Sequence, residues 1–174
     1  QFPDALRALP QVTQLYLSCD AADEESLKQV GRPLFKDFWH RYLESMDILR
    51  ERSERTVCRL TLMRNVNTST PADWARLLQR ASPDFIEIKG VTMAGLFAET
   101  GLGTMNMPTH LEVKQFAHAV AAELPGYGLA CEHEHSNSAL LASERFRAPG
   151  EANQWRTWID FERFADTWED GKLQ

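Results

Sequence analysis

Residues 129–141 read LACEHEHSNSALL, a segment with the apolar flanks of a buried strand and an ionisable centre. Because successive side chains of a strand point to opposite faces, Cys131, His133 and His135 are expected to share one face. Burying ionisable groups is costly unless they are paired, so packing alone does not favour such a centre. The segment therefore predicts a strand that ends at a functional site.

The composition is that of an ordinary soluble globular protein. The 174 residues suffice for one hydrophobic core, and 43% of them are hydrophobic. The 3 cysteines lack paired spacing, which fits reduced thiols of the cytoplasm better than a disulfide framework. No apolar run is long enough to span a membrane. The net charge of −6 argues against nucleic-acid binding by bulk electrostatics alone.

Strand-like and helix-like segments alternate along the chain. Strands are predicted at 14–21, 57–63, 84–93, 129–141 and 154–164, and helices at 4–9, after Pro33, from Pro71 and from Thr109 to Leu124. Asp23 and Glu24 are expected to open an acidic turn, and Leu34 is expected to face the core from the helix after Pro33. No hairpin turn signal separates the first four strands, so the alternation favours parallel strands joined by right-handed crossovers. The chain is therefore predicted to be an α/β protein in which residues 1–174 form a single domain.

Each of the first three predicted strands has one apolar face and one polar face. Glu87 and Lys89, for example, alternate with Ile86 and Ile88. Purely parallel strands are normally apolar on both faces, so this pattern favours a barrel with a wet or ligand-filled interior. In parallel α/β folds the site lies at the carboxyl ends of the strands. Those ends are Ser18–Asp20, Met63–Asn65, Lys89–Thr92 and His133–Asn137.

Two of these features have more than one interpretation. Glu87 and Lys89 can form a buried ion pair inside the barrel or can contact a ligand. Cys131, His133 and His135 on one face would suit zinc, which predicts a zinc-dependent barrel hydrolase as an alternative function. Short His-x-His runs are also often histidines that are simply hydrogen-bonded within a core. If no metal is bound, we expect the rings of His133 and His135 to bond to neighbouring carboxylates, with Glu87 as the first candidate.

Several blocks of the chain resemble, in the same order, the radical-SAM tRNA 4-demethylwyosine synthases of wybutosine biosynthesis. The blocks are VTQLYLSCDA, RPLFKDFW, RLTLM, PDFIEIKGVT, ACEHEHSNSALL and WRTWIDFERF. The resemblance implies a partial (βα) barrel, S-adenosyl-L-methionine and a [4Fe–4S] cluster, with an FMN domain upstream in eukaryotic members. It implies a lyase that condenses pyruvate with N1-methylguanosine in phenylalanine tRNA (tRNA-Phe).

The chain departs from this family in one respect. Radical-SAM chemistry needs three thiolates in a Cys-x-x-x-Cys-x-x-Cys motif, and the sequence contains no such motif. The chain therefore resembles the C-terminal half of the radical-SAM domain, without the first barrel strands, and we expect it to be inactive alone. A non-catalytic tRNA-binding remnant is the remaining alternative.

The resemblance also implies roles for individual residues. It places the cofactor-binding positions at Ser18, Asp20, Arg32, Asn65 and Val91, and the substrate-pocket positions at Glu87, Lys89, His133 and His135. It assigns no metal ligand. A basic strip from Arg41 to Arg55 is expected to contact tRNA phosphates.

The missing half has a consequence for the first strand. Residues 14–20 would lie at an open sheet edge with no proline or lysine to protect it. We expect this edge to pair with the missing half or with another copy of the chain.

Overall fold

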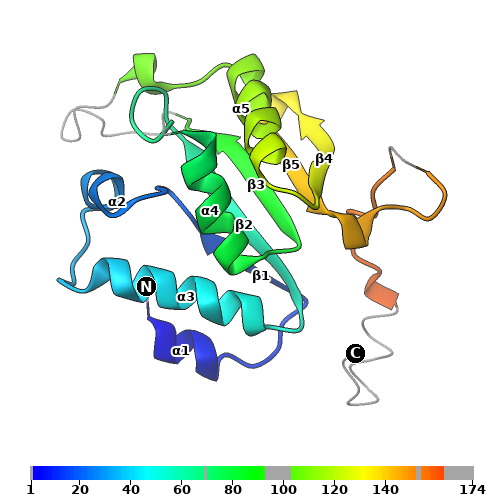
Figure 1. Cartoon of the computed structure of the whole chain (residues 1–174), viewed down its shortest axis with the longest axis horizontal. Helices are drawn as coiled ribbons and strands as arrows, with labels where there is room; N and C mark the ends of the chain where they lie inside the picture. Colours follow the sequence, from blue (N-terminus) through cyan, green and yellow to red (C-terminus); the bar gives the residue numbers. More distant parts are fainter. Residues whose placement is uncertain (1, 69, 93–102, 152–153, 163–174) are drawn as a thin grey trace.

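A computed structural model describes residues 2–68, 70–92, 103–151 and 154–162. These residues form one mixed sheet with helices over one of its faces (Figure 1). The strands are β1 (Gln14–Ser18), β2 (Arg55–Leu62), β3 (Phe85–Gly90), β4 (Tyr127–His133) and β5 (Ser138–Ser143). The helices are α1 (Pro3–Ala8), α2 (Glu24–Gly31), α3 (Phe38–Glu51), α4 (Pro71–Ala81) and α5 (His110–Glu123), with 3-10 turns η1 (Thr104–Asn106), η2 (Glu134–Ser136) and η3 (Glu144–Phe146). Within the described ranges, no helix combines the length and the apolar character needed to cross a membrane.

The strand order in the described sheet is β1-β2-β3-β5-β4. Strands β1, β2 and β3 are parallel, as the sequence predicts, and β1 lies at an edge of the sheet. Strand β5 runs antiparallel to both β3 and β4, so β4 has the same direction as the first three strands. The predicted α/β fold is confirmed, but the prediction of parallel pairing fails for β5.

The prediction of a single strand over residues 129–141 is wrong. The segment is a hairpin in which β4 and β5 are joined by η2 and by Asn137, whose φ of 50° is left-handed. Asparagine tolerates this conformation better than most residues, so Asn137 allows the reversal. The tip of the hairpin still lies at the carboxyl end of β3, because Lys89 pairs with Ser138.

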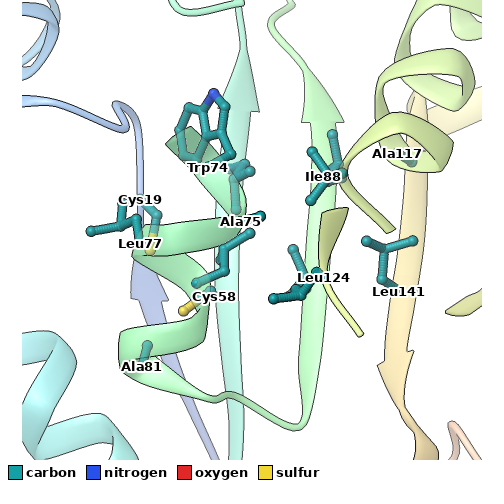
Figure 2. Close-up of a cluster of buried hydrophobic side chains, with 14 of the residues drawn as sticks. Cys19, Cys58, Trp74, Ala75, Leu77, Ala81, Ile88, Ala117, Leu124 and Leu141 are labelled. Carbon is teal, nitrogen blue, oxygen red and sulfur yellow. The ribbon is translucent and has the colours of Figure 1, made fainter. Parts of the chain in front are cut away.

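The core lies between the sheet and helices α3, α4 and α5 (Figure 1). Figure 2 shows Cys58, Ile88 and Leu141, from three strands, in one buried cluster with Trp74 of α4 and Ala117 of α5. All five side chains are fully buried. Burial of a large apolar side chain contributes roughly 1.5–3 kcal/mol, so this layer fixes the positions of the strands.

The helices differ from the sequence predictions at two places. Asp23 and Glu24, predicted as an acidic turn, begin helix α2, where Asp23 Oδ1 accepts from the Ser26 N–H at 2.8 Å. Helix α3 begins only at Phe38, so Leu34, predicted to face the core, is 94% exposed. The predicted start of a helix at Thr109 is confirmed, since Thr109 is the N-cap of α5 and Glu112 completes a capping box. The neighbouring Arg64 guanidinium lowers the pKa of Glu112 to about 2.

The tail, residues 147–151 and 154–162, covers the amino-terminal part of the sheet face that has no helices. The predicted strand at 154–164 is only a bridge between Arg147 and Trp155 in the described residues, and positions 163–164 lie outside them. Arg55 stacks 4.1 Å from the Phe85 ring centre and donates to the Trp158 carbonyl at 2.8 Å. The predicted third strand ends at Gly90, and Met93 also lies outside the described residues.

A candidate ligand site at the carboxyl ends of the strands

The pairing register places most predicted pocket residues on one face, here called the open face, opposite the helices. Paired residues of neighbouring strands share a face. One row across the open face consists of Ser18, Arg59, Glu87, Leu140 and Cys131. The next row, nearer the carboxyl ends, consists of Thr61, Lys89, Ser138 and His133. The predicted polar interior is therefore present as a surface built from five strands.

The charged partner of Glu87 is Arg59. The Arg59 Nε atom lies 3.9 Å from Glu87 Oε1, and both side chains are half-buried. This contact joins adjacent strands within one row of the open face. The structure thus favours a pair with Arg59 over the predicted alternative of a Glu87–Lys89 pair, and Lys89 lies one row nearer the strand ends.

A cavity of about 320 Å³ opens beside the carboxyl end of β1. Its lining includes three of the predicted cofactor-binding residues, Ser18, Asp20 and Arg32. Helices α2 and α3 supply Leu27, Phe38 and Tyr42, and the loop between the two helices supplies a further apolar part of the lining. Such a mixture of apolar walls and a few polar groups is typical of a small-molecule site.

The backbone at Asp20 is held beside this cavity by hydrogen bonds from two side chains. The Asn67 Nδ2 group donates to the Asp20 carbonyl at 2.8 Å, and the Tyr42 hydroxyl donates to the Ala21 carbonyl at 3.1 Å. The carboxylate oxygen Asp20 Oδ1 is buried and has no hydrogen-bond partner among the described residues. Buried polar atoms are nearly always bonded, so this oxygen is available to accept from a bound ligand.

Sequence reasoning missed Asn67. Its side chain is only 1% exposed and makes two bonds to the end of β2, in addition to its bond to Asp20. The Oδ1 atom accepts from Met63 N at 2.7 Å, and Nδ2 also donates to the Thr61 carbonyl at 2.7 Å. An asparagine a few residues beyond a strand is a recognised signal for such local bonds to the backbone. Asn67 therefore joins the end of β2 to the segment that carries Asp20.

The other two predicted cofactor residues lie outside the cavity lining. Asn65 is exposed in the turn after β2, with a left-handed φ of 60°. Val91 follows β3, and its N–H donates to the Leu62 carbonyl at 2.9 Å. Both occupy strand ends at the predicted edge, but the structure does not bring them into the cavity around Asp20.

The hairpin tip separates the residues of the zinc alternative. His135 belongs to η2 and not to a strand, so it does not share a strand face with Cys131 and His133. Across the described ranges, no three His, Cys, Asp or Glu side chains are grouped so that they could hold a metal ion. His133 Nδ1 lies 2.7 Å from Ser136 Oγ, so the expected bond to a carboxylate such as Glu87 is replaced by a serine contact. The geometry proposed for the hydrolase is therefore wrong.

The hairpin tip is fixed to β3 by a tight backbone contact. The Gly90 N–H donates to the Asn137 carbonyl at 2.8 Å, and Asn137 Nδ2 donates to the Pro108 carbonyl at 2.8 Å. A Cβ atom at Gly90 would lie 2.3 Å from Asn137 Nδ2, so only glycine permits this approach. The tip therefore keeps a defined position beside Lys89.

The predicted basic strip is largely used within the molecule. Arg41 pairs with Asp37 at 3.0 Å, Arg52 bonds to Glu54 and to the Leu9 carbonyl, and Arg55 lies under the tail. Guanidinium groups engaged in this way are poorly placed to contact phosphates. The strip as predicted is not a continuous phosphate-binding surface.

The fold is that of a segment of an α/β barrel, with a candidate small-molecule site at the ends of its strands. Residues 80–143 match the family model described as wyosine base formation. Over 166 residues the chain is 49% identical to the S-adenosyl-L-methionine-dependent tRNA 4-demethylwyosine synthase TYW1 of Danio rerio, covering 95% of this chain and 22% of the relative. Over 174 residues it is 48% identical to the synthase of Oryza sativa, covering 99% of this chain and 26% of that protein.

Solved structures show the same relationship. A structure of TYW1 with a lysine–pyruvate adduct bound superposes with a TM-score of 0.72 at 31% identity, covering 82% of this chain and 44% of the other. The crystal structure of archaeal TYW1 gives 0.65 at 31% identity, covering 82% and 43%. The chain is therefore similar, over nearly its whole length, to one segment of the tRNA 4-demethylwyosine synthases. The chain spans only about a quarter of the length of these curated relatives, 22% of one and 26% of the other.

Proposed function

We propose that this chain is the part of a tRNA 4-demethylwyosine synthase that holds one side of S-adenosyl-L-methionine and one side of the substrates. The observation that carries the proposal is the gathering of Ser18, Asp20 and Arg32 in one cavity at the strand ends. The complete protein is proposed to be a radical-SAM lyase that condenses pyruvate with N1-methylguanosine in tRNA-Phe. We place this reaction in the cytoplasm.

The cavity beside β1 suits S-adenosyl-L-methionine. The unpartnered Asp20 Oδ1 would accept from a ribose hydroxyl, and Ser18 lies in the same cavity beside it. The planar guanidinium of Arg32 suits the carboxylate of the methionine end by its fork geometry. When bound, the cofactor supplies the radical chemistry, while these residues bind and orient it.

The residues of this chain do not fit a [4Fe–4S] cluster. Cys19 and Cys58 are fully buried in the core between sheet and helices (Figure 2). Cys131 is exposed on β4. Burial raises the pKa of the Cys19 thiol well above its usual range, and the adjacent Cys58 adds to this shift. A cluster ligand must be a thiolate. We therefore propose that the cluster is bound by another part of the protein and that this chain alone is inactive.

Lys89 is proposed to contact pyruvate. Lys89 lies on the open face at the strand ends, and it is half-buried between Thr61 and Ser138. Its amine can donate to the carboxylate or carbonyl oxygen of a small keto acid. A related TYW1 structure contains a lysine–pyruvate adduct, which shows that pyruvate reaches a lysine in that protein.

The cofactor part of the proposal can be tested by titrating S-adenosyl-L-methionine into the isotope-labelled chain. We expect amide shifts around Ser18, Asp20 and Arg32, and we expect Asp20→Asn to weaken binding about 10-fold. The reason is that a hydrogen bond to a charged acceptor contributes roughly 1.5–3 kcal/mol. NMR spectroscopy gives both the location and the affinity.

Asp47→Asn is the matched control for this titration. Asp47 is an exposed carboxylate on α3 that pairs with Arg80 at 2.6 Å and lies outside the cavity lining. Binding by the control variant should equal that of the unaltered chain. Absence of binding, or equal affinity in Asp20→Asn, would show that this cavity does not hold the cofactor.

A further inference from the structure

Three side chains at the hairpin tip form a continuous hydrogen-bonded chain. Ser138 Oγ lies 2.8 Å from Ser136 Oγ, which in turn lies 2.7 Å from His133 Nδ1. His133 is exposed, whereas Ser136 and Ser138 are half-buried. Ser138 lies directly opposite Lys89, at a spacing of about 5 Å between Cβ atoms for such a pair. This series of hydrogen-bonded side chains therefore runs from solvent to Ser138, the neighbour of Lys89.

The backbone N–H of Ser136 determines which atoms donate and which accept in this hydrogen-bonded series. Its N–H donates to His133 Nδ1 at 3.2 Å, so Nδ1 is an acceptor and the neutral imidazole carries its proton on Nε2. In this state the Ser136 hydroxyl can donate to Nδ1 at 2.7 Å or to the His133 carbonyl at 3.4 Å, and it can accept from the Ser138 hydroxyl.

Protonation of His133 reverses the direction. Nδ1 then no longer accepts from the Ser136 N–H, its own N–H donates to Ser136 Oγ, and the Ser136 hydroxyl donates to Ser138 Oγ. The Ser138 hydroxyl proton is thereby released from Ser136 and can donate into the space beside Lys89. A proton gained by an exposed ring thus becomes a donor at half-buried Ser138, on the open face beside Lys89.

We propose that His133, Ser136 and Ser138 are a proton relay between solvent and a ligand oxygen held beside Lys89. The inference rests on the proposed function, because that function supplies the ligand, a keto acid with carbonyl and carboxylate oxygens. The relay transfers one proton in total. It leaves His133 Nδ1, each serine accepts one proton and passes on its own, and the ligand oxygen receives the last. In the opposite sense, His133 receives a proton from the ligand and releases it to water.

Several charged or titratable groups face the relay. They are His135 in η2, Cys131 on β4, Lys89 on β3, and the Glu87–Arg59 pair in the next row. Carboxyl groups, thiols and amines as classes titrate mainly outside the neutral range, so His135 is the neighbour that must be controlled. Its ring centre lies 6.0 Å from that of His133.

The test follows Ser138 while His133 titrates. In the labelled chain, without S-adenosyl-L-methionine or pyruvate, the Ser138 Cβ resonance should shift with the same midpoint as the His133 imidazole nitrogens. At high pH the nitrogen resonances should show the Nε2–H tautomer. In Ser136→Ala the His133 nitrogens should still titrate, whereas the Ser138 shift should be lost, because the connecting hydroxyl is gone.

Matched variants separate the relay from general disturbance of the hairpin. Ser136→Thr keeps the hydroxyl and should restore the Ser138 shift, and His135→Gln should leave it unchanged. Ser143→Ala, at the other end of β5, should also have no effect. A Ser138 resonance that is independent of His133, or that still follows it in Ser136→Ala, would overturn the relay. Since no ligand is added, failure of the proposed function would not alter this result.

Discussion

Replacing Asn67 by aspartate is expected to lower the free energy of unfolding by at least ~3 kcal/mol. The change removes the amide that donates to the Asp20 and Thr61 carbonyls, at 2.8 and 2.7 Å. Two acceptors thereby lose their partner, and each unsatisfied buried group costs roughly 1–3 kcal/mol. The new carboxylate would also face both carbonyl oxygens at a position that is 1% exposed in the native chain. Urea unfolding followed by circular dichroism measures the loss.

Asn65→Asp is the matched control for this prediction. It introduces the same group in the same turn, at an exposed position whose left-handed φ of 60° aspartate also tolerates. Its effect should stay within about 0.5 kcal/mol. Equal destabilisation by both variants would mean that the added charge matters and that the bonds made by Asn67 do not.

Replacing Gly90 by alanine is expected to cost about 2–3 kcal/mol and to displace the hairpin tip. The added Cβ would lie 2.3 Å from Asn137 Nδ2, 2.9 Å from Asn137 Cγ and 3.0 Å from Pro108 Cγ. These atoms cannot yield easily, because Asn137 is bonded to both Gly90 and Pro108. Hydrogen exchange should become faster at the Gly90 amide and along the end of β5, in addition to the fall in stability.

Gly103→Ala tests whether replacing a glycine by alanine at another position has the same effect. A Cβ there meets nothing within 4 Å, and the backbone is extended, so stability should be nearly unchanged. If Gly90→Ala were as stable as Gly103→Ala, the close contact between β3 and the hairpin would not hold the tip in place.

The elements that sequence analysis predicted well are those fixed by local periodicity. Ile86 and Ile88 alternate with Glu87 and Lys89, and this period of two is enough to assign β3 and both of its faces. The hairpin was missed because its turn contains no glycine or proline. The reversal depends on Asn137 in a left-handed conformation and on the His133 ring capping η2. Neither feature has a strong signal in the sequence.

The candidate site was predictable only in part, for a related reason. Ser18 and Asp20 follow from the end of a strand, and Arg32 from the resemblance to a known family. Asn67 and Ser136 act through bonds to side chains or backbone groups whose positions depend on the exact course of a turn. Leu34 was assigned to the core because the apolar period of α3 extends backward through it, although the helix begins only at Phe38.

Binding of pyruvate beside Lys89 is the central claim, and a titration of pyruvate into the labelled chain tests it most directly. We expect shifts at the Lys89 side chain and at Ser138, and roughly 10-fold weaker binding in Lys89→Gln, as for loss of a hydrogen bond to a charged group. Lys114→Gln is the control, since Lys114 pairs with Glu132 at 3.0 Å on the helix-covered side, and it should bind like the unaltered chain. Absence of binding, or equal affinity in Lys89→Gln, would contradict the account.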